Sequence, residues 1–578
     1  MRKKPNVLMF MVDEMRYPTP YDGPVLREWM DRNLPAQKLF RERGVEFHRH
    51  YAQSAACAPS RTSIFTGQYP TLHGVSQTDG IGKTAWDPGM SWLDPNTVPT
   101  MGDWFRAAGY ETYYKGKWHI SHADIEVPGT KSSLMTTVMN DKNEGRPILE
   151  NIDIYRNADR LDGFGFSGWI GPEPHGRNPA NSGWVRDAQY RHEALALLDA
   201  LEERESDAPW LFVNSYVNPH DIVFFGVMWA SFGFPYPSFE QVPPIPEPPT
   251  QNEDLSTKPT AQASYVTTYG QMFLPQPPVD LYRRFYYYLQ AVSDQYILEV
   301  YRRLERSRFF ENTIIVFTSD HGDTLGAHGG MHQKWYQAYE ETIHVPFIIS
   351  GPLVEQPGRS EFPLTSHADL VPTLLGLCDI DVDEAAKKII PTHSETRELV
   401  GRDLSSVVRG TAPVKNEPVF FMTYDNVSQG LSQITNNRTW NAVATPNQVE
   451  TVIAEIDGEI WKYSRYAQDQ PTPYAGLVTN QNILDKVNTD GVTAEEFEMY
   501  NVSCDPYEQT NLCWPANETV RSKEMLPKMQ ALLDEQKKRK CLVPIVNQGE
   551  PRIGGEGELA ALVPDERDET LDATFVEA

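Results

Sequence analysis

Short runs of apolar residues recur along the first two thirds of this sequence. Residues 7–12, 209–216 and 313–318 are dominated by apolar side chains, as in strands covered on both faces of a sheet. Stretches with helical patterns separate these runs, so the pattern predicts an α/β fold with a sheet covered on both faces by helices. The other elements that we expect are helices at 23–44, 100–108 and 282–307, and strands at 45–47 and 110–114.

From about residue 385 the pattern changes to short strands separated by turns, which favours a second and smaller α+β part. Asp457-Gly458 lies between two of these strands and is a strong hairpin signal. We therefore predict a large α/β domain over residues 1–385 and a C-terminal subdomain over 386–540 with a small antiparallel sheet and a helix. The expected elements are strands at 418–423, 451–456, 459–466 and 497–502, and a helix at 520–539.

Two segments show no clear periodicity. Residues 222–278 are rich in proline and aromatic residues, and a long irregular insert of this kind is usually functional or disordered. We predict that this insert forms a wall of the substrate pocket, and a plain spacer is the alternative. Residues 541–578 form an acidic, glycine-rich tail that we expect to be disordered or to wrap a neighbouring subunit of a homo-oligomer.

The composition limits the partners. The chain has 578 residues with 52 Lys and Arg against 79 Asp and Glu, a net charge of −27. This charge argues against nucleic acid or an anionic membrane as a partner, and a site for an anion must build its own positive potential. The five cysteines do not look like a disulfide framework, although Cys504 and Cys513 could pair. The N-terminal apolar run is too short for a signal peptide, so we expect a cytoplasmic protein.

Two local patterns indicate chemistry. Asp13 and Glu14 follow the apolar run 7–12, and paired carboxylates at the carboxyl end of a strand suit a divalent cation, although a charged turn is the plain alternative. Cys57 begins a predicted helix with Pro59 in its first turn, where unpaired N–H groups favour an anion. A lone cysteine is more often a small buried apolar residue.

The segment Cys57–Arg61, Cys-Ala-Pro-Ser-Arg, resembles the Cys-x-Pro-Ser-Arg signature of the type I sulfatases of the alkaline phosphatase superfamily. A second block, Gly109–His119, is similar to the second signature of that family, Gly-Tyr-x-Thr followed by Gly-Lys-Trp-His. Lys115 stands where the family more often has a small or apolar residue. The Ser-Asp-His-Gly segment at 319–322 also resembles the family, and the resemblance extends over roughly residues 5–540. It implies an alkaline phosphatase-like α/β fold, with a large, mixed and mostly parallel sheet flanked by helices, in which residues 1–385 form the catalytic domain.

The resemblance also implies an active site. In the family the cysteine is oxidised to formylglycine, so Cys57 would be modified by a maturation enzyme of the host. One divalent metal ion is implied, and oxygen-rich ligands fit calcium best, with magnesium or manganese as alternatives. The implied catalytic residues are Cys57, Arg61, Lys117, His119, His220 and Lys334. The implied metal ligands are Asp13, Glu14, Cys57, Asp320 and His321.

The expected reaction is hydrolysis of a small-molecule sulfate monoester to an alcohol and sulfate. Three alternatives stay open. A phosphonate monoester or phosphodiester hydrolase on the same scaffold fits His321, but that branch lacks the lysine that Lys117 provides. A catalytically dead binding protein would be expected to have lost metal ligands or the nucleophile, and none is missing. A thiol enzyme with unmodified Cys57 gives no reason for the metal ligands.

Overall fold

The computed structural model describes residues 3–545, except 143, 175, 177, 235–236, 274–275, 278, 353, 432–439 and 469–493. Residues 1–543 form one compact unit, so the predicted division near residue 385 falls within it. Most of the predicted acidic tail, from residue 546 onward, lies outside the described residues. No helix in the described part of the chain is long and apolar enough to cross a membrane.

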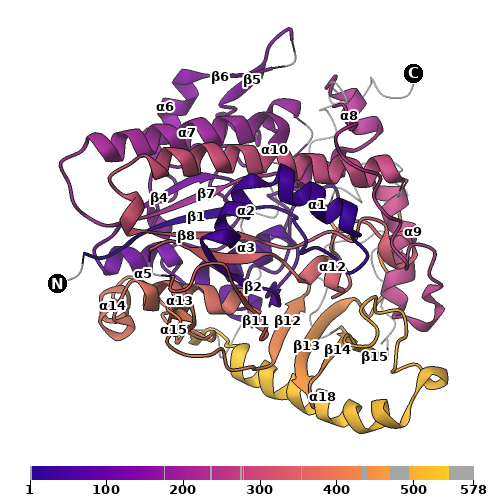
Figure 1. Cartoon of the computed structure of the whole chain (residues 1–578). Helices are drawn as coiled ribbons and strands as arrows, with labels where there is room; N and C mark the ends of the chain where they lie inside the picture. Colours follow the sequence, from indigo (N-terminus) through magenta and orange to yellow (C-terminus); the bar gives the residue numbers. More distant parts are fainter. Residues whose placement is uncertain are drawn as a thin grey trace. The chain divides into compact units, whose positions relative to one another are not determined.

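A large mixed sheet forms the centre of this unit (Figure 1). Among the described residues it has seven strands in the order β10-β2-β9-β8-β1-β7-β4. Strands β4, β7, β1 and β8 run parallel, and β9 is antiparallel to both β8 and β2. This topology confirms the predicted fold class. The bounds are β1 (Asn6–Val12), β2 (Gly44–Phe47), β4 (Glu111–Gly116), β7 (Trp210–Ser215), β8 (Thr313–Ser319), β9 (Phe347–Ser350) and β10 (Arg359–Glu361).

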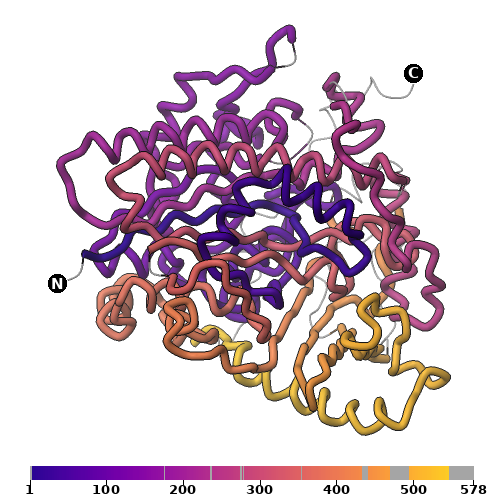
Figure 2. The backbone as a smooth tube through the Cα atoms, in the orientation of Figure 1, coloured from indigo at the N-terminus to yellow at the C-terminus, as the bar shows by residue number. Residues whose placement is uncertain are grey.

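Alternate residues of β1 face opposite layers of helices. Leu8, Phe10 and Val12 share one apolar cluster with α2, α7 and α10, whereas Val7 and Met11 share another with α3, α5 and α13. Figures 1 and 2 show α7 and α10 above the sheet and α5 and α13 below it. The sheet is therefore covered on both faces. The bounds are α2 (Pro35–Glu42), α3 (Cys57–Thr66), α5 (Met101–Ala107), α7 (Gly183–Glu203), α10 (Asp280–Glu305) and α13 (Leu370–Leu377).

Two local predictions differ from the structure. The helix expected at 23–44 is two helices, α1 (Pro24–Asn33) and α2, because the residue before a proline is driven out of the helical region and Leu34 has φ −114° and ψ 62°. The insert 222–278 is not irregular throughout, since it contains α8 (Val227–Ser231) and α9 (Thr260–Met272).

The C-terminal part contains the predicted antiparallel sheet. Its order is β12-β13-β14-β15, and α18 (Val520–Lys540) packs against β12, β13 and β14. Asp457 and Gly458 have φ values of 56° and 81°, so both adopt the positive φ that a tight hairpin turn needs. All five cysteines are free, so Cys504 and Cys513 do not pair. The strands are β12 (Val419–Thr423), β13 (Gln448–Ile456), β14 (Glu459–Ala467) and β15 (Glu496–Asn501).

Shorter elements complete the described part of the chain. Two small sheets pair β3 with β11 and β5 with β6. The strands are β3 (His50–Tyr51), β5 (Thr137–Met139), β6 (Gly145–Pro147) and β11 (Thr365–Ser366), and the helices are α4 (Pro70–His73), α6 (Leu149–Ala158), α11 (Ala327–Gly330), α12 (Glu340–Ile343), α14 (Val382–Ile389) and α15 (Ser405–Val408).

Candidate active site

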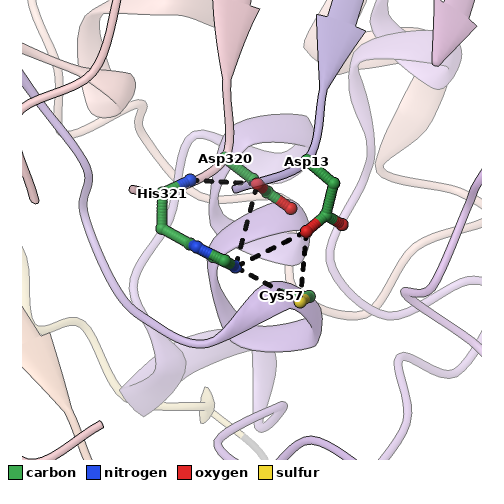
Figure 3. Close-up of side chains that lie close together, drawn as sticks. All are labelled: Asp13, Cys57, Asp320 and His321. Carbon is green, nitrogen blue, oxygen red and sulfur yellow. Dashed lines mark hydrogen bonds and ion pairs between the residues drawn. The ribbon is translucent and has the colours of Figure 1, made fainter. Parts of the chain in front are cut away.

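The carboxyl ends of β1 and β8 bring two predicted metal ligands together. Asp13 follows β1 and Asp320 follows β8, and these strands are parallel neighbours. Figure 3 shows both side chains with His321 and with Cys57 from the start of α3. One ligand atom from each of the four residues lies within 4.8 Å of the others, and all four side chains are buried. The group offers two carboxylates, one imidazole and one sulfur atom.

The hydrogen bonds of His321 fix which ring nitrogen can act as a ligand. Its Nδ1 lies 3.0 Å from the carbonyl oxygen of Gly322, which can only accept, so Nδ1 carries the proton. The lone pair of Nε2 then faces Sγ of Cys57 at 3.2 Å. Burial, with Lys334 nearby, holds the pKa of His321 well below its usual value. A neutral imidazole between two carboxylates fits a divalent cation.

The two carboxylates differ in charge environment. Burial raises the pKa of Asp13, but Lys117 and other nearby cations outweigh it, so the net pKa lies well below the usual value. The Lys117 Nζ to Asp13 Oδ2 distance is 2.6 Å. Burial and the neighbouring Asp13 raise the pKa of Asp320 to about 7. Asp13 is therefore the carboxylate of the pair that stays ionised at neutral pH.

Cys57 lies in the first turn of α3, as its position before Pro59 predicts. Burial and the nearby Asp13 raise the pKa of its thiol to about 12, so an unmodified Cys57 is not a thiolate at neutral pH in this protein environment. Ser60 Oγ donates to the carbonyl oxygen of Asp320 at 2.6 Å. This bond ties the helix that carries Cys57 to the strand end that carries the ligands.

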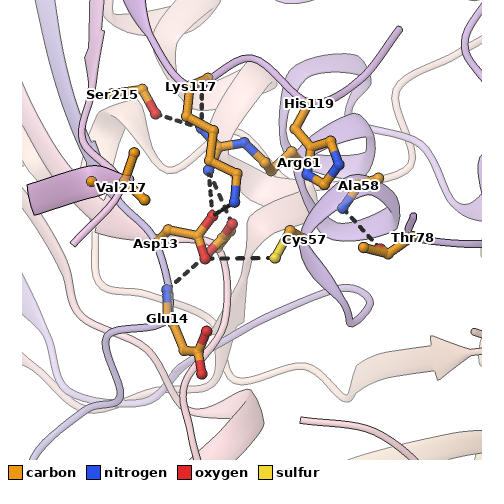
Figure 4. Close-up of polar contacts among 12 residues, drawn as sticks. Asp13, Glu14, Cys57, Ala58, Arg61, Thr78, Lys117, His119, Ser215 and Val217 are labelled. Carbon is orange, nitrogen blue, oxygen red and sulfur yellow. Dashed lines mark hydrogen bonds and ion pairs between the residues drawn. The ribbon is translucent and has the colours of Figure 1, made fainter. Parts of the chain in front are cut away.

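Arg61 lies one helical turn after Cys57 (Figure 4), and its side chain is fully buried. Its Nη1 lies 3.0 Å from Oδ2 of Asp320 and 3.4 Å from Oδ2 of Asp13. Its Nε donates to the carbonyl oxygen of Trp118 at 3.0 Å, and Nη2 donates to Ser215 Oγ. Arg61 thus joins α3 to the ends of β4, β7 and β8, which fixes its charge in the site.

Glu14 lies apart from the four-residue group. Its φ of 72° is unusual for a residue other than glycine, and its Oε2 lies 3.0 Å from Nζ of Lys334. Burial raises the pKa of Glu14 well above its usual value. Its ligand atom instead groups with those of Asp13 and His220, within 4.8 Å of one another. The structure therefore pairs Glu14 with the predicted catalytic lysine and histidine.

The predicted catalytic histidines occupy different surroundings. His119 Nε2 lies 2.6 Å from Oδ1 of Asp79, and its backbone N–H donates to Glu173 Oε1 at 2.8 Å. His220 starts a 3-10 turn after β7, and burial, with Lys117 nearby, lowers its pKa well below the usual value. Sequence reasoning missed Asp79 and Glu173, because both lie in loops without periodicity or a motif.

Comparisons with known proteins find one family match and several relatives. The model of the Sulfatase family matches residues 5–380. A choline-sulfatase of Rhizobium meliloti is 28% identical over 390 residues, which cover 66% of this chain and 69% of that protein. An arylsulfatase of Clostridium perfringens is 24% identical over 437 residues, which cover 69% of this chain and 80% of that protein.

Solved structures share the fold. The structure of a 2-O GAG sulfatase has a TM-score of 0.58 at 21% identity and covers 93% of this chain and 92% of its own. A phosphonate monoester hydrolase from Silicibacter pomeroyi has a TM-score of 0.58 at 18% identity and covers 93% of this chain and 96% of its own. These neighbours establish the architecture, and the choice of substrate depends on the site.

Proposed function

The chain belongs to the sulfatase family of hydrolases, and we propose that it cleaves a sulfate monoester through a formylglycine made from Cys57. The observation that carries this proposal is the position of Cys57. Its Sγ lies 3.2 Å from His321 Nε2 and 3.5 Å from Asp13 Oδ1. Arg61, Lys117 and Lys334 supply the positive charge that an anionic ester needs in a protein of net charge −27.

The donor set fits one divalent cation. Asp13, Asp320 and His321 would hold it together with the formylglycine oxygen that takes the place of the Cys57 sulfur. Two carboxylates and one neutral imidazole suit calcium, magnesium or manganese, and we favour calcium. When bound, such a cation polarises sulfuryl oxygens and lowers the pKa of a hydroxyl group bound to it.

The side chains provide the proton transfers of a two-step reaction. One hydroxyl of the hydrated aldehyde loses its proton to solvent and attacks sulfur, which breaks the bond from sulfur to the alcohol oxygen. Lys334, whose pKa is raised, or His220 in its protonated form, gives that oxygen a proton. His119 then takes the proton of the second hydroxyl. The bond between the former aldehyde carbon and the sulfate oxygen breaks, its electron pair leaves with sulfate, and the aldehyde is restored.

Hydrolysis of a phosphonate monoester or phosphodiester is the second candidate. His321 at the second position of the Ser-Asp-His-Gly segment favours it, since the phosphonate monoester hydrolase branch has histidine there. Lys117 favours the sulfatase, because that branch lacks this lysine. The two candidates share the nucleophile and the metal, so the measured preference between substrates decides between them.

The test compares hydrolysis of 4-nitrophenyl sulfate with that of 4-nitrophenyl phenylphosphonate. The sulfatase proposal predicts a higher kcat/KM for the sulfate ester and at least a thousandfold loss in Cys57→Ala. Cys378→Ala is the matched control, because Cys378 is also buried and burial also raises its pKa to about 12. A phosphonate preference would favour the second candidate, and full activity of Cys57→Ala would refute both.

A further inference from the structure

One loop connects the predicted base His119 with the protein surface. The loop spans residues 79–93, and Asp79 at its start contacts His119 Nε2 at 2.6 Å. Near its end, the ring of Trp92 lies 5.8 Å from the ring of His119, centroid to centroid. Trp92 Nε1 donates to the carbonyl oxygen of Ala85 at 3.0 Å, which holds the loop together. The loop is therefore in contact with His119 at two points.

The same loop presents an aromatic ring to solvent. The Trp86 side chain is 42% exposed, although tryptophan is usually well covered. Its ring lies 4.2 Å from the ring of His122, and His122 lies 6.5 Å from Trp92, measured between centroids. His122 follows His119 by three residues after β4. We call these four rings, His119, Trp92, His122 and Trp86, the aromatic run; it leads from the site to the surface.

The aromatic run is held by anchors that fix the loop before any ligand binds. Lys83 is 2% exposed, and its Nζ donates to the carbonyl oxygen of Asn426 at 2.6 Å and lies 3.3 Å from Asp425 Oδ1. The backbone N–H of Gly80 donates to the carbonyl oxygen of Lys83 at 2.7 Å. A surface fixed in this way loses little conformational entropy on binding.

We propose that the aromatic run binds the alcohol part of the substrate and selects alcohols carried on a ring over short acyclic alcohols. This inference rests on the proposed sulfatase function. Single exposed apolar side chains are common on proteins, but Trp86 is continuous with the catalytic histidine through ring contacts. Tryptophan offers a rigid apolar face that stacks on an aromatic ring or on the C–H face of a pyranose.

The kinetic test compares Trp86→Ala with wild type on three substrates: 4-nitrophenyl sulfate, a pyranose 6-sulfate and ethyl sulfate. The proposal predicts that Trp86→Ala raises KM five- to tenfold for at least one ring substrate and leaves kcat unchanged. For ethyl sulfate, KM should stay unchanged as well. The ring substrate with the larger effect identifies the kind of ring. Trp514→Ala is the control, because Trp514 is 43% exposed and lies after the C-terminal sheet. Equal effects on all three substrates, or none, would overturn the inference.

A binding test separates this inference from the proposed function. The Cys57→Ala variant lacks the nucleophile, so calorimetry can measure its affinity for the intact esters. We expect Cys57→Ala/Trp86→Ala to bind a ring ester about tenfold more weakly than Cys57→Ala and to bind ethyl sulfate equally well. If the variants show ring selectivity in binding but the wild type does not hydrolyse sulfate esters, the proposed role of the aromatic run is supported and the sulfatase proposal is rejected. If the wild type hydrolyses sulfate esters but the variants show no ring selectivity in binding, only the proposed role of the aromatic run is rejected.

Discussion

At the scale of single residues, the orientation of His119 depends on Asp79. The imidazole Nε2 lies 2.6 Å from the Asp79 carboxylate, so this acceptor fixes the direction of the ring. We predict that Asp79→Asn lowers kcat ten- to hundredfold and leaves KM nearly unchanged, because general base catalysis contributes roughly that much or more. Steady-state kinetics on a sulfate ester measures both constants.

Asp87→Asn is a suitable control for this substitution. Asp87 lies in the same loop, is 4% exposed, and accepts from the backbone N–H groups of Gly89 and Leu431. Asparagine keeps one of the two acceptor oxygens and loses the other, but the contact between Asp79 and His119 is untouched, so kcat should stay within about twofold of wild type. An equal loss of kcat in both variants would show that Asp79 only supports the loop.

The proposed metal site gives a second prediction for a single residue. Asp320→Asn removes one carboxylate from the four-residue group, and we expect calcium affinity to fall at least about a hundredfold. Calorimetric titration of chelator-treated protein measures it. Asp294→Asn is the matched control, because burial raises the pKa of Asp294 to about 7, as for Asp320, while its carboxylate caps the start of α2. Unchanged calcium binding by Asp320→Asn would place the metal elsewhere.

Sequence motifs predicted most residues of the candidate site. The contacts between loops could not be predicted from the sequence. Asp13, Cys57, Asp320 and His321 meet because strand ends and a helix start gather at one edge of a parallel sheet, and this rule can be applied to a sequence. The separate position of Glu14 depends on its backbone angle and on Lys334, which no pattern records. The partnership of Asp79 with His119 depends on the path of an aperiodic loop.

At the scale of elements, the insert is tied to the core by a buried ion cluster. His328 in α11 lies between Glu253, which precedes α9, and Glu341 in α12, at 3.1 and 3.3 Å. Its ring stacks on Tyr339 at 3.5 Å between centroids. Burial lowers the pKa of His328, but the two carboxylates outweigh it and raise the pKa to about 9. The imidazolium therefore stabilises the fold at neutral pH.

This cluster predicts a pH dependence of stability. The folded pKa of His328 lies above its usual value of 6.5, so the stabilisation is complete below pH 6.5 and is lost as the pH rises through 9. The shift in pKa corresponds to a loss of about 3 kcal/mol in the free energy of unfolding. Denaturant unfolding of wild type and His328→Gln between pH 6 and 10 measures it. The difference between the two proteins should shrink over this range, and a constant difference would contradict the assignment.

Helices and strands could be predicted from the hydrophobic pattern wherever signals within a few residues determine the structure. The central strands and the hairpin at Asp457 were predictable, because continuous apolar runs and a turn dipeptide act over few residues. The break at Leu34 needed the effect of Pro35, which a pattern of apolar residues does not show. In α9, buried Ala261, Tyr265 and Tyr269 recur every four residues, but neighbouring prolines masked this spacing.

At the scale of the whole molecule, the C-terminal part takes part in organising the site. Asp425, just after β12, is 2% exposed and accepts from Thr78 N at 3.1 Å and from Trp335 Nε1 at 2.7 Å. Its Oδ1 also lies 3.3 Å from Nζ of Lys83. One carboxylate therefore joins the C-terminal part to the loop that contacts His119.

We predict that Asp425→Ala lowers the free energy of unfolding by about 3–5 kcal/mol, because it leaves the buried Lys83 ammonium without its counter-ion. The thermal unfolding temperature and kcat should fall together. Asp457→Asn is the control and should change neither, because it removes only an exposed ion pair to Arg521 and asparagine tolerates the positive φ of this turn residue. Loss of stability without loss of kcat would show that the C-terminal part does not organise the site.

The central claim is that Cys57 becomes the formylglycine nucleophile, and peptide mass spectrometry tests it most directly. The tryptic peptide that contains Cys57 should be about 18 Da lighter than the unmodified sequence, from the change of thiol to aldehyde, and the modified fraction should rise in proportion to specific activity across preparations. A preparation that hydrolyses sulfate esters at full rate while Cys57 remains an unmodified thiol would contradict the account.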